Sequence, residues 1–201
     1  MYHKIPAQTE GNCSDNISDR LFETEAVASE FFQGLKKRFL DINSWELFAG
    51  KEKAEFTLCD ENGDLSLDPP QVGNFVRIKL PGLHNPTGDS YDWVQIETVE
   101  EDQNTAEETV YIRLCPSENP KKNDGKTAHF FKDKATSNFL IKREGKKVTV
   151  AVLARNEIPN TDDLNLLEKL RNNVVAIGGI VIGSKFQWTS FTDGLLKKDE
   201  K

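Results

Sequence analysis

The strongest constraint on the fold is a change in hydrophobic period along the chain. Between residues 54 and 154, apolar and polar residues alternate in short runs separated by polar or glycine-containing turns. Such alternation is typical of strands that are buried on one face. The runs predict six strands, at 54–60, 74–80, 93–99, 109–114, 137–143 and 147–154. The short loop Glu144-Gly145-Lys146 favours an antiparallel hairpin between the last two, so the middle of the chain is predicted to be an antiparallel meander.

Helical spacing replaces this alternation on both sides of the meander. Apolar residues recur every three or four positions over Arg20–Leu40, which predicts an amphipathic helix, and Asp41–Gly50 predicts a short second one. From Asp162 to about Lys197 the same spacing returns, which predicts one long C-terminal helix. We expect it to bend at its glycines, which are Gly178, Gly179 and Gly183.

The first 18 residues differ in composition from the rest of the chain. They are rich in Asn, Ser, Asp and Gln and contain no apolar stretch, so we expect a flexible leader over 1–18 and a single domain over 19–197. The three cysteines, Cys13, Cys59 and Cys115, form no C-x-x-C motif and cannot all pair within one chain. This pattern favours reduced thiols and predicts a cytoplasmic location.

Charge and motifs exclude several classes of function. The net charge of −7 argues against a broad basic surface, so no nucleic-acid partner is expected. The longest apolar run has nine residues, from Val174 to Ile182, which is too short for a membrane span. The three histidines lie far apart in the sequence, and Asp60–Asp64 lacks the glycine and glutamate positions of a calcium loop, so no metal site is expected. No phosphate loop or nucleophile elbow occurs either, and we expect no cofactor.

The order of elements predicts where a ligand would bind. An antiparallel sheet with one apolar face needs a cover, and the flanking helices supply it. A curled sheet that grips a helix leaves a space between them unless large side chains fill it, and such a space is a natural ligand site. The predicted fold class is therefore α+β, with about six meander strands gripping a long C-terminal helix and with two N-terminal helices.

This pattern resembles the START-like, or SRPBCC, superfamily, which has the helix-grip (Bet v 1-like) fold. The resemblance lies in front helices ending in Asp41–Phe48, a meander containing Val72–Ile78, and the terminal helix from Asp162. It implies a protein that holds lipids, polyketides, hormones or other hydrophobic molecules, and some members are cyclases or hydrolases. Members commonly place a strand before the front helices, but none is recognisable in residues 1–18.

Candidate ligand-binding residues are spread over the helices, the sheet and its loops. Each aromatic candidate is expected to be a core residue first and a ligand contact second. For the two polar candidates, a structural role stands beside the functional one. His129 is either a general acid or base or a loop residue bonded to a backbone group. Arg155 either binds a ligand carboxylate or pairs with an acid such as Glu157, and Asp92 is a further candidate acid. The full set of candidates is Trp45, Phe56, Trp93, His129, Phe131, Phe139, Arg155 and Trp188.

Three functions remain open at this point. The first is binding of a hydrophobic small molecule in a cavity between the sheet and the C-terminal helix. The second is an enzyme of the cyclase, isomerase or hydrolase type on the same scaffold, which would require His129, Asp92 or Arg155 to converge in the cavity. The third is an interaction module with a packed core, for which a homodimer is one form.

Overall fold

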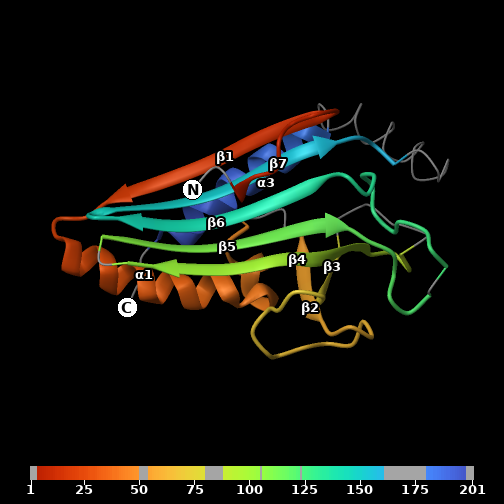
Figure 1. Ribbon diagram of the computed structural model, residues 1–201, viewed down its shortest axis with the longest axis horizontal. Coiled ribbons are helices and arrows are strands. Elements are labelled where there is room, and N and C mark those ends of the chain that lie inside the picture. Colours follow the sequence, from red (N-terminus) through yellow and green to blue (C-terminus); the bar gives the residue numbers. More distant parts are fainter. Residues whose placement is uncertain are drawn as a thin grey trace.

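A seven-stranded antiparallel sheet forms the centre of the computed structural model (Figure 1). The structure describes residues 4–49, 54–79, 88–104, 106–122, 124–160 and 180–197. The strand order is β1-β7-β6-β5-β4-β3-β2, so the last six strands form the predicted meander. Their bounds are Glu55–Cys59 (β2), Phe75–Lys79 (β3), Asp92–Gln103 (β4), Glu107–Pro116 (β5), Thr136–Glu144 (β6) and Lys147–Glu157 (β7).

Strand β1, Asn12–Leu21, corrects two expectations, the flexible leader over residues 12–18 and the count of about six strands. It pairs antiparallel with β7, from Asn12 opposite Glu157 to Leu21 opposite Lys147. The prediction was wrong because the inward-facing side chains of β1 are polar and contact polar side chains of the C-terminal helix. The hydroxyls of Ser18 and Thr192, for example, lie 2.8 Å apart. A strand with such an inner face lacks the apolar alternation by which the other strands are recognised.

Residues 4–11, here called the N-terminal strap, cross the outer face of the sheet. Ile5 packs against an apolar cluster on that face, formed by Tyr111, Leu140, Ala151 and Leu153. The Lys4 carbonyl accepts hydrogen bonds from the Arg113 guanidinium at 2.7 Å and from the Tyr111 hydroxyl at 3.3 Å. The strap therefore covers apolar surface that the outer face of an antiparallel sheet would otherwise expose to water.

The first helix, α1, runs from Glu25 to Leu40. It begins later than predicted because Arg20 and Leu21 end β1, and because the Thr24 side chain accepts a bond from the Val27 N–H at 3.2 Å, as an N-cap does. Its buried residues recur every three or four positions, and they are Ala28, Phe32, Leu35 and Phe39. The predicted second helix is a short 3₁₀ helix, η2, over Ile42–Leu47.

The C-terminal helix, α3, spans Ile180–Leu195 in the described part of the chain. It packs against β1 and β7 and touches α1 (Figure 1). The predicted start at Asp162 and the predicted bends at Gly178 and Gly179 lie outside the described residues. Among the helices that the structure describes, none has both the length and the apolar character needed to cross a membrane.

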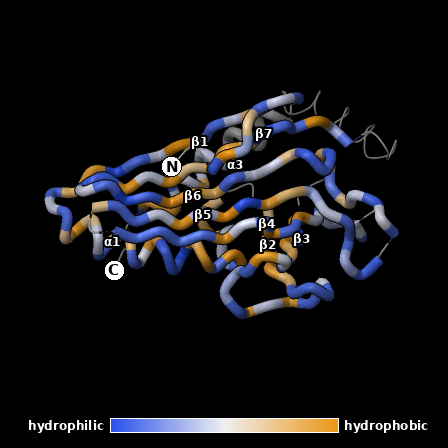
Figure 2. The backbone as a smooth tube through the Cα atoms, in the orientation of Figure 1, coloured by the Kyte–Doolittle hydropathy of each residue, from blue (hydrophilic) through white to orange (hydrophobic). Residues whose placement is uncertain are grey.

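The main core lies between the inner face of the sheet and the helices. Apolar and polar residues alternate along the strands (Figure 2), and the inward-facing ones in β7 are Val148, Val150 and Val152. Strands β4 and β5 extend further than predicted, to Gln103 and from Glu107. Acidic residues in the β4 extension have lysine partners, since Lys4 pairs with Asp102 at 2.5 Å and Lys36 pairs with Glu101.

Candidate functional site

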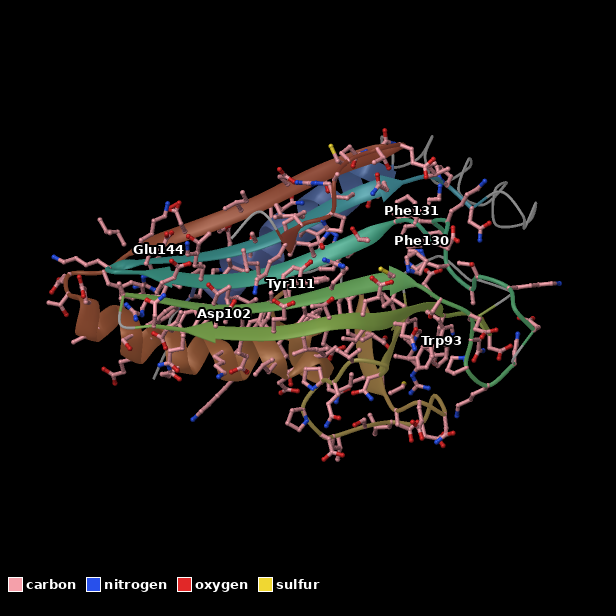
Figure 3. The ribbon with its side chains drawn as sticks, in the orientation of Figure 1. Trp93, Asp102, Tyr111, Phe130, Phe131 and Glu144 are labelled. Atoms are coloured by element: carbon pink, nitrogen blue, oxygen red, sulfur yellow. The ribbon has the colours of Figure 1, made fainter. Side chains whose placement is uncertain are left out.

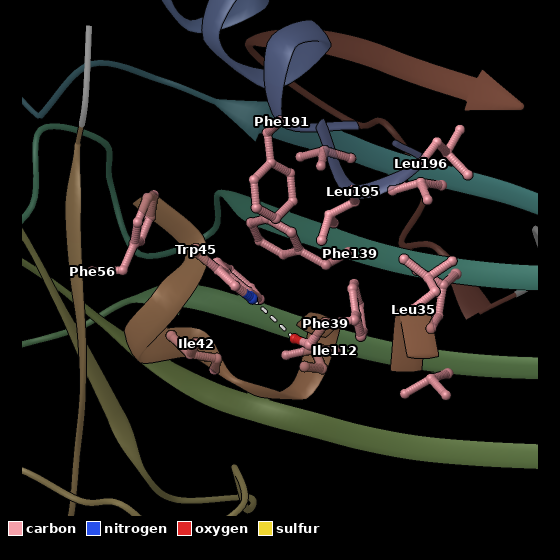
Figure 4. Close-up of a cluster of buried hydrophobic side chains, with 14 of the residues drawn as sticks. Leu35, Phe39, Ile42, Trp45, Phe56, Ile112, Phe139, Phe191, Leu195 and Leu196 are labelled. Atoms are coloured by element: carbon pink, nitrogen blue, oxygen red, sulfur yellow. Dashed lines mark hydrogen bonds between the residues drawn. The ribbon is translucent and has the colours of Figure 1, made fainter. Parts of the chain in front are cut away.

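Five aromatic side chains from four elements meet between the sheet and the helices, and four of them, all except Trp188, are labelled in Figure 4. This aromatic cluster comprises Trp45 from η2, Phe56 from β2, Phe139 from β6, and Trp188 and Phe191 from α3. The Trp45 ring centroid lies 4.6 Å from Phe139, 5.3 Å from Phe191 and 5.6 Å from Phe56. Trp188 lies 5.2 Å from Phe139 and 6.1 Å from Phe56. Four of the predicted site residues are thus brought together.

The members of this cluster differ in their exposure. Trp45 is fully buried, and its indole N–H donates to the Phe39 carbonyl at 2.9 Å, the dashed line in Figure 4. Phe139 and Phe191 are also fully buried, whereas Trp188 is only partly buried. Trp188 is therefore the member of the aromatic cluster that an incoming molecule reaches with the least rearrangement.

Trp93, another predicted site residue, lies on the opposite face of the sheet. Val94 and Ile96 point into the main core, so the alternation of β4 turns Trp93 outward. It packs in a separate small cluster with Phe75, at a ring distance of 6.4 Å, and its indole N–H donates to the Gly88 carbonyl at 3.1 Å. The sheet therefore separates Trp93 from the aromatic cluster. Figure 3 shows Trp93 at the same end of the sheet as Phe130 and Phe131.

His129 and Phe131 lie in the loop between β5 and β6. His129 is buried, stacks on Phe130 at a centroid distance of 4.2 Å, and accepts the Phe131 N–H on Nδ1 at 2.9 Å. The Asn160 side chain donates to the His129 carbonyl at 3.1 Å. Burial lowers the pKa of His129 to about 3. The ring is thus neutral at physiological pH and performs a structural role in this loop.

The buried imidazole predicts a specific loss of stability in acid. In the unfolded chain His129 has a pKa near 6.5, so the unfolded state binds one more proton than the folded state as the pH falls from about 6.5 to about 3. The free energy of unfolding should fall in this window by up to about 1.4 kcal/mol per pH unit from this group. His129→Asn keeps an acceptor for the Phe131 N–H and should show a shallower slope. Urea unfolding of the wild type and the variant at pH 4, 5, 6 and 7 measures how the free energy of unfolding depends on pH. The same pH dependence in both proteins would contradict the burial of a neutral His129.

Arg155 points away from the aromatic cluster, on the outer face of β7. Leu153 packs on the outer face, and Arg155 follows it two residues later on the same strand. Its guanidinium donates to the Asp15 carboxylate at 2.5 Å and to the Ala154 carbonyl at 2.7 Å. Arg155 is therefore paired with Asp15, and neither it nor His129 reaches the aromatic cluster.

Glu157 is an inward-facing acid that sequence reasoning considered only as a partner for Arg155. A β-bulge shifts the pairing, so that Ser14 lies opposite Ala154 but Asn12 lies opposite Glu157. Asn12 and Ser14 share the inner face of β1, and Glu157 thus returns to the inner face. Its carboxylate has no hydrogen-bond or ion-pair partner in the part of the chain that the structure describes, and burial raises its pKa to about 7. The bulge residue, Asn156, is the one local signal, since asparagine tolerates a positive φ.

Comparison with known proteins identifies the fold but no close relative. No family model matches the sequence, and no curated protein matches it significantly. The hypothetical protein jhp0584 from Helicobacter pylori is similar in structure, with a TM-score of 0.52 and 13% identity over 96% of this chain and 89% of that one.

Two weaker structural matches carry no inference about function, because their TM-scores are below 0.5. They are Ara h 8.0201 (TM-score 0.36, 9% identity, 93% of this chain and 100% of that one) and truncated norcoclaurine synthase from Thalictrum flavum (0.35, 10%, 96% and 100%). The strand before the helices, the strand order and the C-terminal helix define a helix-grip, Bet v 1-like fold. The predicted helix-grip fold is thus confirmed.

Proposed function

We propose that this protein binds a hydrophobic small molecule, such as a lipid or a polyketide-like compound, in a cavity between the sheet and the C-terminal helix. The observation that supports this proposal is the aromatic cluster, which joins β2, β6, η2 and α3 and leaves Trp188 partly exposed. Its ligand-contacting residues would be Trp45, Phe56, Phe139 and Trp188. A cytoplasmic location belongs to the same proposal, in keeping with three free cysteines.

Trp188 is central to the proposed binding mode. It belongs to α3, and its ring contacts the sheet at 5.2 Å to Phe139 and 6.1 Å to Phe56. Contacts of this kind contribute about 0.5–1.5 kcal/mol each beyond the burial of their area. A planar or extended apolar ligand inserted beside Trp188 would replace these contacts with equivalent ones, so admission of the ligand costs little.

Binding of the neutral fluorescent probe N-phenyl-1-naphthylamine tests this proposal. We expect a saturable rise in its fluorescence at one site per chain and a higher melting temperature in its presence. Trp188→Ala should weaken its affinity about tenfold, which corresponds to about 1.4 kcal/mol. Trp93→Phe changes a tryptophan on the opposite face and should leave the affinity unchanged. No saturable binding and no thermal shift would contradict the proposal.

One observation favours an interaction module as the second candidate. Ring contacts of 4.6–6.2 Å place several of the protein's own side chains among η2, β6 and α3. A core packed in this way would exclude ligands and leave the surface, as a homodimer or with another protein, to carry the function. The proposed enzyme lacks such support, because His129 and Arg155 lie away from the aromatic cluster.

A further inference from the structure

A strained turn of backbone directs Glu157 toward the inner face of the sheet. Arg155 and Asn156 together lie opposite Cys13 in the pairing of β7 with β1, and Asn156 has a φ of +57°. Bulges of this kind re-aim a side chain, and residues in sparsely populated φ regions persist where surrounding contacts determine them. Without the extra residue, strand alternation would turn Glu157 outward, beside Arg155.

The N-terminal strap supplies the contacts that hold this bulge. Asn156 Oδ1 accepts the Thr9 N–H at 2.8 Å, the Thr9 hydroxyl at 3.1 Å and the Glu10 N–H at 3.2 Å. Its Nδ2 donates to the Ala7 carbonyl at 3.1 Å, and its backbone N–H donates to Gln8 at 3.0 Å. These five bonds are concentrated on the residue that turns Glu157 inward.

Gly11 completes the strap's hold on the bulge. Its φ is +66°, and a Cβ at this position would lie 2.6 Å from the Glu157 carbonyl oxygen. Only glycine allows the strap to approach β7 so closely. The backbone on both sides of the bulge is therefore fixed by long-range contacts rather than by local preference.

Glu157 lies on the same side of the sheet as α3. It is opposite Asn12, at the start of β1, whereas the aromatic cluster lies nearer the middle of that strand. Thr192 contacts Ser18 at 2.8 Å and Thr189 contacts Asn16 at 3.2 Å, so α3 runs alongside β1 with its Ile180 end toward Asn12 (Figure 1). Asn12, the partner of Glu157, lies four residue steps from Asn16 along β1, which is about 13 Å at about 3.3 Å per step. This is about the length of an extended ten-carbon chain.

We propose that Glu157 is the polar anchor of the ligand site and binds the ammonium group of an apolar primary amine whose hydrocarbon part lies beside Trp188. This inference rests on the proposed function. A partly buried carboxylate without a partner among the described residues is poorly solvated, and an ammonium group would form charge-assisted hydrogen bonds with it. The protein's net charge of −7 also favours cations over anions near its surface.

A matched set of ten-carbon compounds tests the anchor by isothermal titration calorimetry. Decylamine, decanol and decanoate share a ten-carbon skeleton and carry a cationic, a neutral and an anionic head group, and each is used below its micelle concentration or solubility limit. We expect the wild-type protein to bind decylamine at least tenfold more tightly than decanol, and decanoate most weakly. Glu157→Gln should abolish the preference for decylamine over decanol. Glu23→Gln removes the same charge from an exposed position and should keep the preference.

The binding results distinguish a failure of the Glu157 anchor from a failure of the proposed function. Binding of decanol and of N-phenyl-1-naphthylamine without any preference for decylamine would overturn the anchor and leave the proposed function standing. A decylamine preference that persists in Glu157→Gln, with the variant's melting temperature confirming that it is folded, would also overturn the anchor. Failure of all these compounds to bind would overturn both proposals.

Discussion

Replacing Trp45 by alanine is expected to lower the free energy of unfolding by about 3–5 kcal/mol, the range for truncating a large buried aromatic residue. Trp45 is fully buried and contacts Phe39, Phe56, Phe139 and Phe191. The variant loses these contacts and leaves a cavity where η2, β6 and α3 meet. Urea unfolding at neutral pH, monitored by far-UV circular dichroism, measures the change.

Two further variants serve as controls for Trp45→Ala. Both Trp45→Phe and Trp45→Ala leave the Phe39 carbonyl without the indole N–H. Because Trp45→Phe keeps a ring in the cluster, it should destabilise the protein less than Trp45→Ala. Leu47→Ala changes an exposed residue of the same 3₁₀ helix, and we expect an effect within about 0.5 kcal/mol. A loss in Trp45→Ala no larger than that in Leu47→Ala would contradict the packing described for the aromatic cluster.

Breaking the buried ion pair between Arg143 and Glu108 should have an effect of similar size. Both side chains are only 6% exposed, and Arg143 Nε lies 2.5 Å from Glu108 Oε2 on the inner face, beneath α1. Gln33 of α1 donates to the second carboxylate oxygen at 2.7 Å. Arg143→Met leaves a buried carboxylate without its counter-charge, and we expect a loss of about 3–5 kcal/mol in the free energy of unfolding.

A double variant separates the charge effect from the packing effect. Glu108→Gln combined with Arg143→Met removes both charges and should recover most of the stability lost in Arg143→Met, because no unpaired charge remains buried. Lys79→Met breaks the exposed pair with Glu55 and should change stability by at most about 1 kcal/mol. If the double variant were less stable than Arg143→Met, the pair would not be acting through burial of charge.

Much of the fold could be predicted because its main signals are local. The inward-facing valines of β7 and the three- and four-residue spacing in α1 each report burial on one face. Strand β1 escaped prediction because its inward-facing residues are polar, and two of them, Asn16 and Ser18, contact the hydroxyl groups of Thr189 and Thr192 of α3. Its existence depends on pairing with β7, which is far away in the sequence.

The candidate site was predictable only in part, for a related reason. Trp45, Phe56, Phe139 and Trp188 meet because each lies on an inward face, whereas Trp93 and Arg155 lie on outward-facing positions of β4 and β7. If the alternation of inward and outward side chains had been extended to the ends of β4 and β7, it would have predicted that both residues lie on the outer face of the sheet. Glu157 breaks that alternation, and Asn156 is the only local signal of the bulge, because the bulge depends on contacts with the N-terminal strap.

Native mass spectrometry with added ligand tests the central claim most directly. Protein incubated with N-phenyl-1-naphthylamine or decanol should retain one molecule per chain in the native spectrum, and denaturation should release it. Freshly purified protein measured in the same way would reveal any molecule that it carries from the cell. A native spectrum that shows only the bare chain, or only its dimer, at saturating concentrations of both compounds would contradict the account and favour a packed core with a protein partner.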